Sequence, residues 1–360
     1  MPPTSQDVIN RYSEGPTPQR VGPSLYSEVT GFERDDGKSI ERNPVSTAQD
    51  YRRNMPKVRH PVTALVVTAI TVLWTVPTFG LLVTSIRPRW EVHYSGWWTI
   101  FQNPVVTLEN YRVVLTGGDV LPDGISPYLF NSLAIAVPAT VFPIVLGAMV
   151  AYAISAMRFR GATAILVVII ALQIIPVQMA LLPLLELFNS GWSIGPVPIV
   201  PNLIDPQTGR SLLAGRYITL WIVHTMFALP LCIFLFYSFG SRLSREIIDA
   251  AQIDGASHFL IFRRLYLPLM IPALATFAIF QFLWVWNDLL IAITFVGSSS
   301  SVAPITAYVA YLKGGFSQNE HLLTAAAFVA MVIPLVIFFA LQRYYARGFV
   351  PGGYVRDRST

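Results

Sequence analysis

Six long apolar stretches are the feature of this 360-residue chain that most restricts its fold. A helix needs about 20 predominantly apolar residues to cross the hydrocarbon core of a membrane, which is about 30 Å thick. The stretches of this kind are residues 62–86, 128–156, 162–188, 217–241, 269–295 and 322–341. Charged residues make up 12% of the chain, against about 25% in soluble proteins. We therefore predict an all-α, polytopic membrane protein with six transmembrane helices.

The distribution of Lys and Arg predicts how these helices are oriented. Basic residues are concentrated near the two ends of the chain and in segment 242–268. Because cytoplasmic loops carry the excess of Lys and Arg, both termini and this segment are expected to be cytoplasmic. The protein is then a multi-pass protein of the cell (inner or plasma) membrane. Its net charge of +5 reflects this bias, so no nucleic-acid partner is expected.

Three regions are expected along the chain. Residues 1–60 are rich in Pro, Ser, Gly and charged residues without a sustained apolar period, which is typical of a disordered tail, here cytoplasmic. Residues 61–345 form the six-span domain, and residues 346–360 form a cytoplasmic C-terminal tail. The lone cysteine, Cys232, lies within the fourth apolar stretch, where a small apolar packing residue is expected.

A charged segment, residues 246–268, lies between the fourth and fifth apolar stretches, with the sequence EIIDAAQIDGASHFLIFRRLYLP. Gly255 is the residue type that most easily takes the left-handed conformation at a helix C-terminus. A second helix is expected to begin at Ser257 and to stop before Pro268. The segment therefore predicts a helix–turn–helix on the membrane surface. Its small-residue face consists of Ala250, Ala251, Gly255 and Ala256.

This segment resembles the cytoplasmic EAA loop of permease subunits of ATP-binding-cassette importers. The family pattern is Glu-Ala-Ala, three residues, Gly, nine residues, then Ile-x-Leu-Pro. The spacing here is complete, with Asp249 in place of Glu and Leu265 in place of Ile. Further runs resemble the maltose-transporter type of sugar permease and lean towards its α-glucoside branch. These runs are 254–257, 272–274, 286–288, 342–344 and 347–348.

The resemblance implies that segment 242–268 docks onto an ATPase. The implied docking residues are Glu246, Ile247, Asp249, Ala250, Ala251, Asp254, Gly255, Ala256, Ser257, Phe259, Phe262, Leu265, Leu267 and Pro268. Phe259 or Phe262 could fill a pocket of the ATPase as an anchor. Near the C-terminus, the resemblance implies further ATPase contacts by Gln342, Arg347 and Gly348.

The resemblance also implies the rest of the assembly. The expected partners are a second homologous permease subunit, two cytosolic ATPase subunits, an extracytoplasmic sugar-binding protein and membrane lipid. The chain itself is not expected to be an enzyme or to bind a cofactor, so that ATP and Mg²⁺ belong to the ATPase subunits. Its nearest match to a phosphate-binding loop, Gly37-Lys38-Ser39, has Phe32 where that loop needs Gly. The five histidines show no metal-ligand spacing.

Polar residues within the apolar stretches suggest a substrate pathway. Gln281, Trp284, Asn287 and Asp288 recur at steps of three and four residues, so we expect them to share one helical face. An aromatic ring with amides and a carboxylate suits a sugar, although the same face could instead pack two permeases together. Glu186 is a further candidate, either lining the pathway or satisfied by water at the interface.

Two other classes of protein could also contain six membrane spans of this kind. An ion-driven secondary transporter or channel would need intramembrane acid–base relays, for which only Asp288 and Glu186 offer weak candidates. An intramembrane protease could use the serine run 297–301 with His224, but this run falls in an external loop and no orienting partner is evident. Segment 189–216, longer than is typical of the family, could meet the sugar-binding protein or be specific to this lineage.

Overall fold

The computed structural model describes residues 61–118, 122–157, 159–200, 202–203, 217–313 and 319–348, with side chains up to Gln342 at the C-terminal end. The predicted tail over residues 1–60 lies outside the described residues, as do residues 349–360.

Five described helices are long and apolar enough to cross a membrane. They are α4 (Pro61–Ser85), α7 (Ser126–Ala156), α10 (Ile218–Gly240), the continuous helix His258–Asn287 and α16 (Glu320–Gly348). The continuous helix consists of α12 (His258–Ile261), a π-helical turn η3 (Phe262–Tyr266) and α13 (Leu267–Asn287). A bent pair of shorter helices raises the number of candidate spans to six. The all-α membrane fold is thus confirmed.

The third apolar stretch is not the single helix that we predicted over residues 162–188. It forms α8 (Ala162–Ala171) with a 3₁₀ turn η2 (Leu172–Ile174), followed by α9 (Val177–Ser190), and the two parts are bent by 98°. Pro176 explains the break, because a proline disfavours helical dihedrals in the residue before it. Ile175 is accordingly extended, with φ −73° and ψ 117°.

The fifth apolar stretch differs from the prediction at both ends. The helix begins well before residue 269, at His258, and it ends at Asn287. Asp288 is extended, with ψ 135°, and α14 (Leu290–Val296) then begins as a separate helix. After it follows α15 (Ile305–Lys313).

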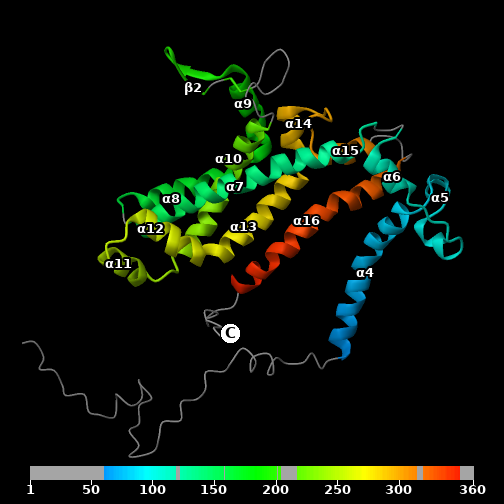
Figure 1. Ribbon diagram of the computed structural model, residues 1–360, viewed down its shortest axis with the longest axis horizontal. Helices are drawn as coiled ribbons and strands as arrows, with labels where there is room; N and C mark the ends of the chain where they lie inside the picture. The colour runs from blue at the N-terminus through cyan, green and yellow to red at the C-terminus, as the bar shows by residue number, and fades with distance from the viewer. Residues whose placement is uncertain are drawn as a thin grey trace, which may run out of the picture. The chain divides into compact units, whose positions relative to one another are not determined.

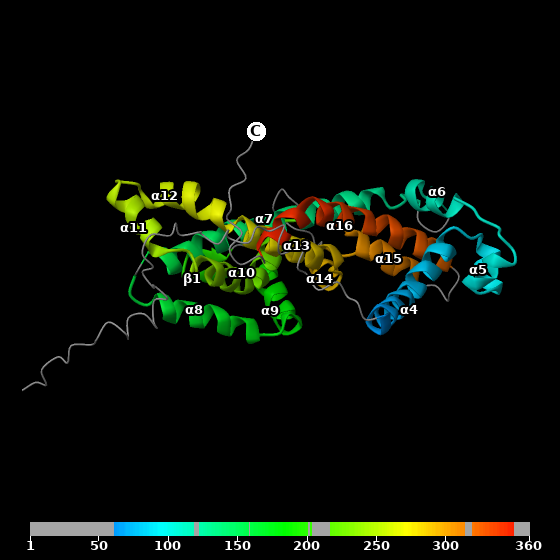
Figure 2. The same cartoon turned by 90° about the horizontal axis from the view of Figure 1, so that it is seen from below.

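The transmembrane core is formed by four helices that lie side by side. α7 packs against α10 and α13, and α13 packs against α16 (Figures 1 and 2). Cys232 is fully buried between α10 and α7, and its Sγ lies 3.2 Å from the carbonyl oxygen of Pro143. A Cβ at Gly147 would lie only 2.5 Å from this sulfur, so glycine is what permits the close approach. The predicted packing role of Cys232 is confirmed.

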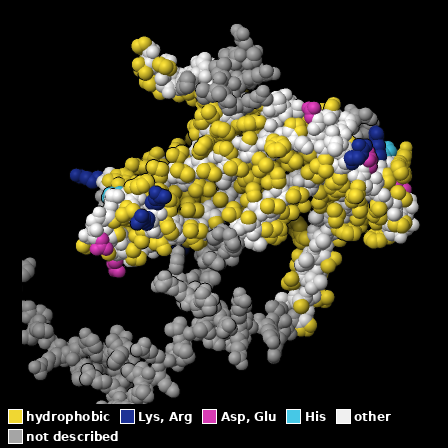
Figure 3. All heavy atoms as spheres, in the orientation of Figure 1, with side chains coloured by type: hydrophobic (Ala, Val, Ile, Leu, Met, Phe, Trp, Pro, Cys, Tyr) yellow, Lys and Arg dark blue, Asp and Glu magenta, His cyan; other side chains and the backbone are white. Residues whose placement is uncertain are grey.

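The surface of the helices is largely apolar. Figure 3 shows hydrophobic side chains over most of the visible face, with charged side chains gathered towards two ends. One end carries α11 (Arg245–Ile253) and α12, and the other carries α5 (Arg89–Tyr94) and α6 (Glu109–Thr116). Many apolar side chains of α4, α8 and α16 are exposed, as expected where lipid or other helices cover them.

A buried arginine organises the segment after α4. The Arg87 side chain is 1% exposed. Its guanidinium donates hydrogen bonds to the Glu91 carboxylate at 2.7 Å, the Ser95 and Thr99 hydroxyls, and the Gly96 carbonyl at 2.8 Å. These contacts fold α5 and the 3₁₀ turn η1 (Trp97–Phe101) around the end of α4. Trp97 packs edge-to-face on Phe79 of α4.

Segment 189–216 contains the only two strands in the described part of the chain. β1 (Trp192–Ile194) and β2 (Val197–Val200) pair antiparallel as a hairpin. Gly195 has a φ of +59° in the turn between them. Residues 204–216 of this segment lie outside the described residues.

Candidate functional site: the helix pair between α10 and α13

A tight, fully hydrogen-bonded turn ends α11. The Gly255 N–H donates to the Gln252 carbonyl at 3.0 Å, and the Ala256 N–H donates to the Ala251 carbonyl at 3.0 Å. These two bonds form a Schellman motif, which requires a left-handed residue at its centre. Gly255 fills that position with a φ of +81°. The predicted helix end at Gly255 is confirmed.

The second helix of the pair starts as expected but does not stop where we predicted. The Ser257 hydroxyl caps α12 by accepting a hydrogen bond from the Leu260 N–H at 3.3 Å. The helix then continues through Pro268, so the predicted stop is wrong. The π-helical turn explains this: the Leu267 N–H bonds to the Phe262 carbonyl five residues earlier, and the wider turn accommodates a proline that has no N–H to donate.

The inner side of the helix pair is packed into the transmembrane core. Ile248, Ile261 and Tyr266 are buried in one cluster with side chains of α7 and α10. The Tyr152 hydroxyl of α7 lies 3.1 Å from Nδ1 of His258, which adds a polar contact at the edge of the cluster. The helix pair is therefore packed against the transmembrane helices and is not an unpacked loop.

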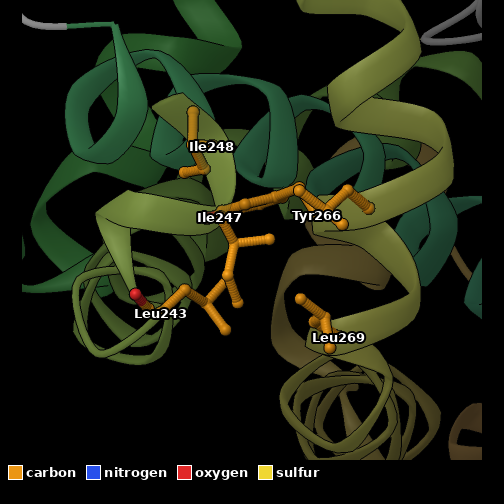
Figure 4. Close-up of a pocket in the computed structure, with 7 residues that line it drawn as sticks. Leu243, Ile247, Ile248, Tyr266 and Leu269 are labelled. Atoms are coloured by element: carbon orange, nitrogen blue, oxygen red, sulfur yellow. The ribbon is translucent and has the colours of Figure 1, made fainter. Parts of the chain in front are cut away.

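A small apolar hollow lies between α11 and the first turn of α13 (Figure 4). Its lining consists of Leu243, Ser244, Ile247, Ile248, Leu265, Tyr266 and Leu269. Ile247 lies on the side of α11 that faces Leu269, and it remains half exposed. The hollow thus belongs to the junction between the pair and the bundle.

The outer side of the helix pair exposes large apolar side chains. Ile253 is 86% exposed and Phe259 is 70% exposed, with Gly255 in the turn between their helices. The predicted docking residues that are exposed are Glu246, Ile247, Asp249, Ala250, Asp254, Gly255, Ser257, Phe259 and Pro268. A surface of this kind suits a protein partner, because exposed apolar groups next to small residues permit close approach.

Some predicted docking residues instead face the bundle. Phe262 stacks on Tyr266 at 6.0 Å between ring centroids and contacts Tyr152, so only Phe259 remains as a candidate anchor. Ala251, Ala256, Leu265 and Leu267 are half-buried. Ile253 was not among the predicted docking residues, although its place one turn after Asp249 on the charged side of α11 was a usable signal.

At the C-terminal end, α16 extends further than the predicted span over 322–341. It runs to Gly348, so the first residues of the predicted tail are helical. Gln342 is exposed. Arg347 and Gly348 belong to the helix, but their side-chain positions lie outside the described part.

The prediction that the four polar and aromatic residues of the fifth span share one helical face is wrong. Gln281 is buried and donates to the Ala139 carbonyl of α7 at 3.3 Å, whereas Trp284 and Asn287 are exposed on another side of α13. Asp288 lies beyond the end of the helix. Of the four residues at this three- and four-residue spacing, only Trp284 and Asn287 are both exposed on α13.

Asp288 caps α14 instead. Its carboxylate accepts hydrogen bonds from the backbone N–H groups of Ile291 at 3.3 Å and Ala292 at 3.0 Å. Nε2 of the buried His224, on α10, lies 3.8 Å from the same carboxylate. His224 therefore faces an acid and not the serine run that a protease would need. Glu186 is exposed on α9. Among the described residues, no group of three or more His, Cys, Asp or Glu could hold a metal ion.

Comparison with known proteins agrees with this architecture. The family described as binding-protein-dependent transport system inner membrane component matches residues 143–350. The osmoprotective compounds uptake permease protein of Synechocystis sp. is 40% identical over 289 residues, 80% of this chain and 90% of that protein. The alpha-glucoside transport system permease protein of Rhizobium meliloti is 44% identical over 249 residues, 69% of this chain and 60% of that protein.

A solved structure shows the same fold. It is a bacterial ABC transporter involved in the import of the acidic polysaccharide alginate, and it matches with a TM-score of 0.57 at 20% identity, over 79% of this chain and 95% of that chain. The present chain belongs to the family of binding-protein-dependent transport system inner membrane components. It is a multi-pass permease subunit of an ABC importer in the inner membrane, and the predicted family, location and non-enzymatic class are confirmed.

Proposed function

We propose that this chain and a second homologous permease form a transmembrane path for a sugar of the α-glucoside class. Two cytosolic ATPase subunits would drive transport, and an extracytoplasmic sugar-binding protein would deliver the substrate. The sugar class is supported by the names of the relatives, among them the alpha-glucoside permease and an arabinooligosaccharides permease of Bacillus subtilis. This chain would bind no cofactor, and ATP with Mg²⁺ would be held by the ATPase subunits.

The observation that carries this proposal is the two-sided helix pair between α10 and α13. One side presents Ile253 and Phe259 outward, and the other side buries Ile248, Ile261 and Tyr266 against α7 and α10. An ATPase bound to the outer side would therefore move the transmembrane helices whenever it moved the pair. Such coupling requires that the ATPase and the sugar each bind the inward-open and outward-open states unequally.

The same geometry suggests how motion would reach the substrate path. Because α12 continues through the π-helical turn into α13, the docking side and the transmembrane helix form one continuous helix. The exposed side chains of Trp284 and Asn287 lie on the last turns of that helix. We assign them to the sugar path, since an aromatic ring can stack on the apolar face of a sugar while an amide pairs with its hydroxyl groups.

The proposal is tested by ATP hydrolysis and sugar uptake in liposomes that hold the complete transporter. The binding protein is added with and without an α-glucoside such as maltose. The variant Ile253→Ala with Phe259→Ala should lose the stimulation by loaded binding protein, because the outer side of the pair loses its large apolar contacts. Trp98→Ala, which removes an exposed aromatic side chain from η1 and leaves the helix pair unchanged, serves as the matched control.

Unchanged stimulation in the double variant would refute the docking role. Uptake by the permease pair without ATPase subunits, driven by an ion gradient, would instead support the secondary-transporter alternative. Stimulation by a binding protein loaded with a different solute class would overturn the α-glucoside assignment while leaving the docking role intact.

A further inference from the structure

The third membrane segment turns sideways before it has crossed a bilayer. The helical run Ala162–Ile174 contains 13 residues and is about 20 Å long at about 1.5 Å per residue. The hydrocarbon core is about 30 Å thick, so this run alone is too short to cross it. After Pro176 the chain continues at 98° as α9, which carries the hairpin β1–β2 at its end (Figure 1).

The base of the hairpin is fixed to the helical core. The Leu203 N–H donates to the Phe188 carbonyl at 2.8 Å, and both side chains are buried in the same cluster. Phe188 also packs against Phe295 of α14, with 5.8 Å between the ring centroids. Gly191, at the end of α9, has a φ of +69°, and a Cβ there would lie 2.3 Å from the Asn202 side chain. The hairpin is therefore held at a defined position, so the composition of its exposed surface can indicate what surrounds it.

The exposed surface of the hairpin is apolar and carries no charge. All three residues of β1 are exposed, and so are the first three of β2. The large apolar side chains are exposed as follows: Trp192 52%, Ile194 60%, Val197 56% and Ile199 49%. Residues 187–203 contain no Asp, Glu, Lys, Arg or His. Because side chains alternate between the two faces of a strand, both faces of this hairpin lack charge.

This composition argues for a permanent apolar neighbour. A binding protein that docks and leaves would expose the whole hairpin to water in every transport cycle, and soluble surfaces rarely expose apolar patches of this kind. The hairpin is also continuous with exposed apolar side chains of the bent membrane segment. Val167 and Leu172 are exposed on the run before the bend, and Met179 and Leu182 are exposed on α9.

The position of the hairpin along the chain decides the leaflet. Segment 242–268 is expected on the cytoplasmic side of the membrane. Among the described elements, α10 is the one span between the hairpin and this segment, so the hairpin is expected on the outer side. The free edges of a two-stranded hairpin need hydrogen-bond partners, which the hydrocarbon core cannot supply but the headgroup region can. Tryptophan is also enriched at that depth.

We propose that α9 and the hairpin β1–β2 form an in-plane anchor in the headgroup region of the outer leaflet, with lipid as the partner of Trp192, Ile194, Val197 and Ile199. The anchor would hold the outer end of the third segment at a fixed depth, because interfacial anchors help to set the tilt of a membrane helix. This role does not depend on which solute is transported.

The test measures what surrounds the hairpin in the complete transporter in liposomes. Cys232→Ala provides a background without native cysteine, and Ile194→Cys or Val197→Cys is labelled with bimane. Quenching is compared for lipids that carry a nitroxide near the headgroup and for aqueous iodide. Val167→Cys on α8 is the lipid-facing control, and Ser299→Cys in the exposed loop after α14 is the water-facing control.

The lipid nitroxide should quench both hairpin labels about as strongly as the Val167→Cys label. Lipid quenching as weak as at Ser299→Cys would overturn the proposal. In that case strong iodide quenching would indicate a water-facing surface open to the binding protein. Weak quenching by both agents would indicate that the second permease covers the hairpin.

Discussion

The contact between Gly240 and Tyr266 gives the sharpest quantitative test of how the helix pair is joined to α10. A Cβ at Gly240 would lie 2.4 Å from the Tyr266 hydroxyl oxygen, below any real carbon–oxygen contact, and 3.1 Å from the two nearest ring carbons. Tyr266 is 1% exposed, so its ring cannot simply move into solvent. Overpacking of this kind typically costs about 1–3 kcal/mol. We therefore expect Gly240→Ala to destabilise the permease by about that amount.

The hydroxyl alone should account for most of this loss. Within the described part of the chain, this buried hydroxyl forms no hydrogen bond of standard geometry. Tyr266→Phe should thus be neutral or stabilising on its own, because it removes an unsatisfied buried polar group. Combined with Gly240→Ala, it removes the closest clash and should restore stability, so that the two substitutions couple by about 1 kcal/mol or more.

The assay is thermal unfolding of the four proteins, wild type, both single variants and the double variant, in the same detergent. Sugar-stimulated ATP hydrolysis of the same four is measured in liposomes, because the contact joins the docking side to the bundle. Gly147→Ala, which brings a Cβ against Cys232, is a control for general overpacking that Tyr266→Phe should not rescue. Additive effects of Gly240→Ala and Tyr266→Phe would refute the reasoning.

Three further outcomes follow from other contacts. Gly255→Val should reduce sugar-stimulated ATP hydrolysis more than Gly255→Asn, because a left-handed conformation costs about 1–2 kcal/mol for most residues and less for Asn; equal loss would argue against a conformational role. Arg87→Met should lower the unfolding midpoint strongly, since breaking a buried ion pair costs about 3–5 kcal/mol, whereas Arg112→Met, in an exposed pair, should leave the midpoint unchanged. Phe262→Ala should lower the midpoint because its ring packs on Tyr152 and Tyr266, whereas Phe259→Ala should leave it unchanged and weaken ATPase binding; the reverse order would contradict the assignment.

Much of this fold could be predicted from the sequence because hydrophobic length is such a strong constraint in a membrane. The apolar stretches located the helices, and Gly255 located the end of α11 through its conformational freedom alone. Pro176 was a readable signal for the break in the third segment, but proline is also tolerated inside membrane helices. Pro268 shows the ambiguity: there a π-helical turn absorbed it and the helix continued.

The candidate site was harder to predict, because the direction in which each side chain points depends on the helices packed against it. Gln281 and Trp284 fit one helical period, yet only Gln281 meets the backbone of α7. Asp288 fits the same period, but its carboxylate found the free N–H groups of α14 and so marks a helix boundary. Phe259 and Phe262 are equivalent in sequence terms, and it is the ring contacts with Tyr152 and Tyr266 that distinguish the inward-packed Phe262. Such choices are made by tertiary contacts that periodicity does not encode.

The π-helical turn at Phe262–Tyr266 also fixes the rotational setting of everything that follows it. A π-helical turn holds one residue more than an α-helical turn, and one residue corresponds to about 100° of rotation in an α-helix. If that turn tightened to α-helical geometry, α13 would present a different set of side chains to each neighbour. Gln281 would leave the Ala139 carbonyl, and the residues now directed outward with Trp284 would turn towards another helix. The one extra residue in the π-helical turn thus determines which side chains α13 exposes about 20 residues further along the chain. This turn lies next to the helix pair on which an ATPase would act.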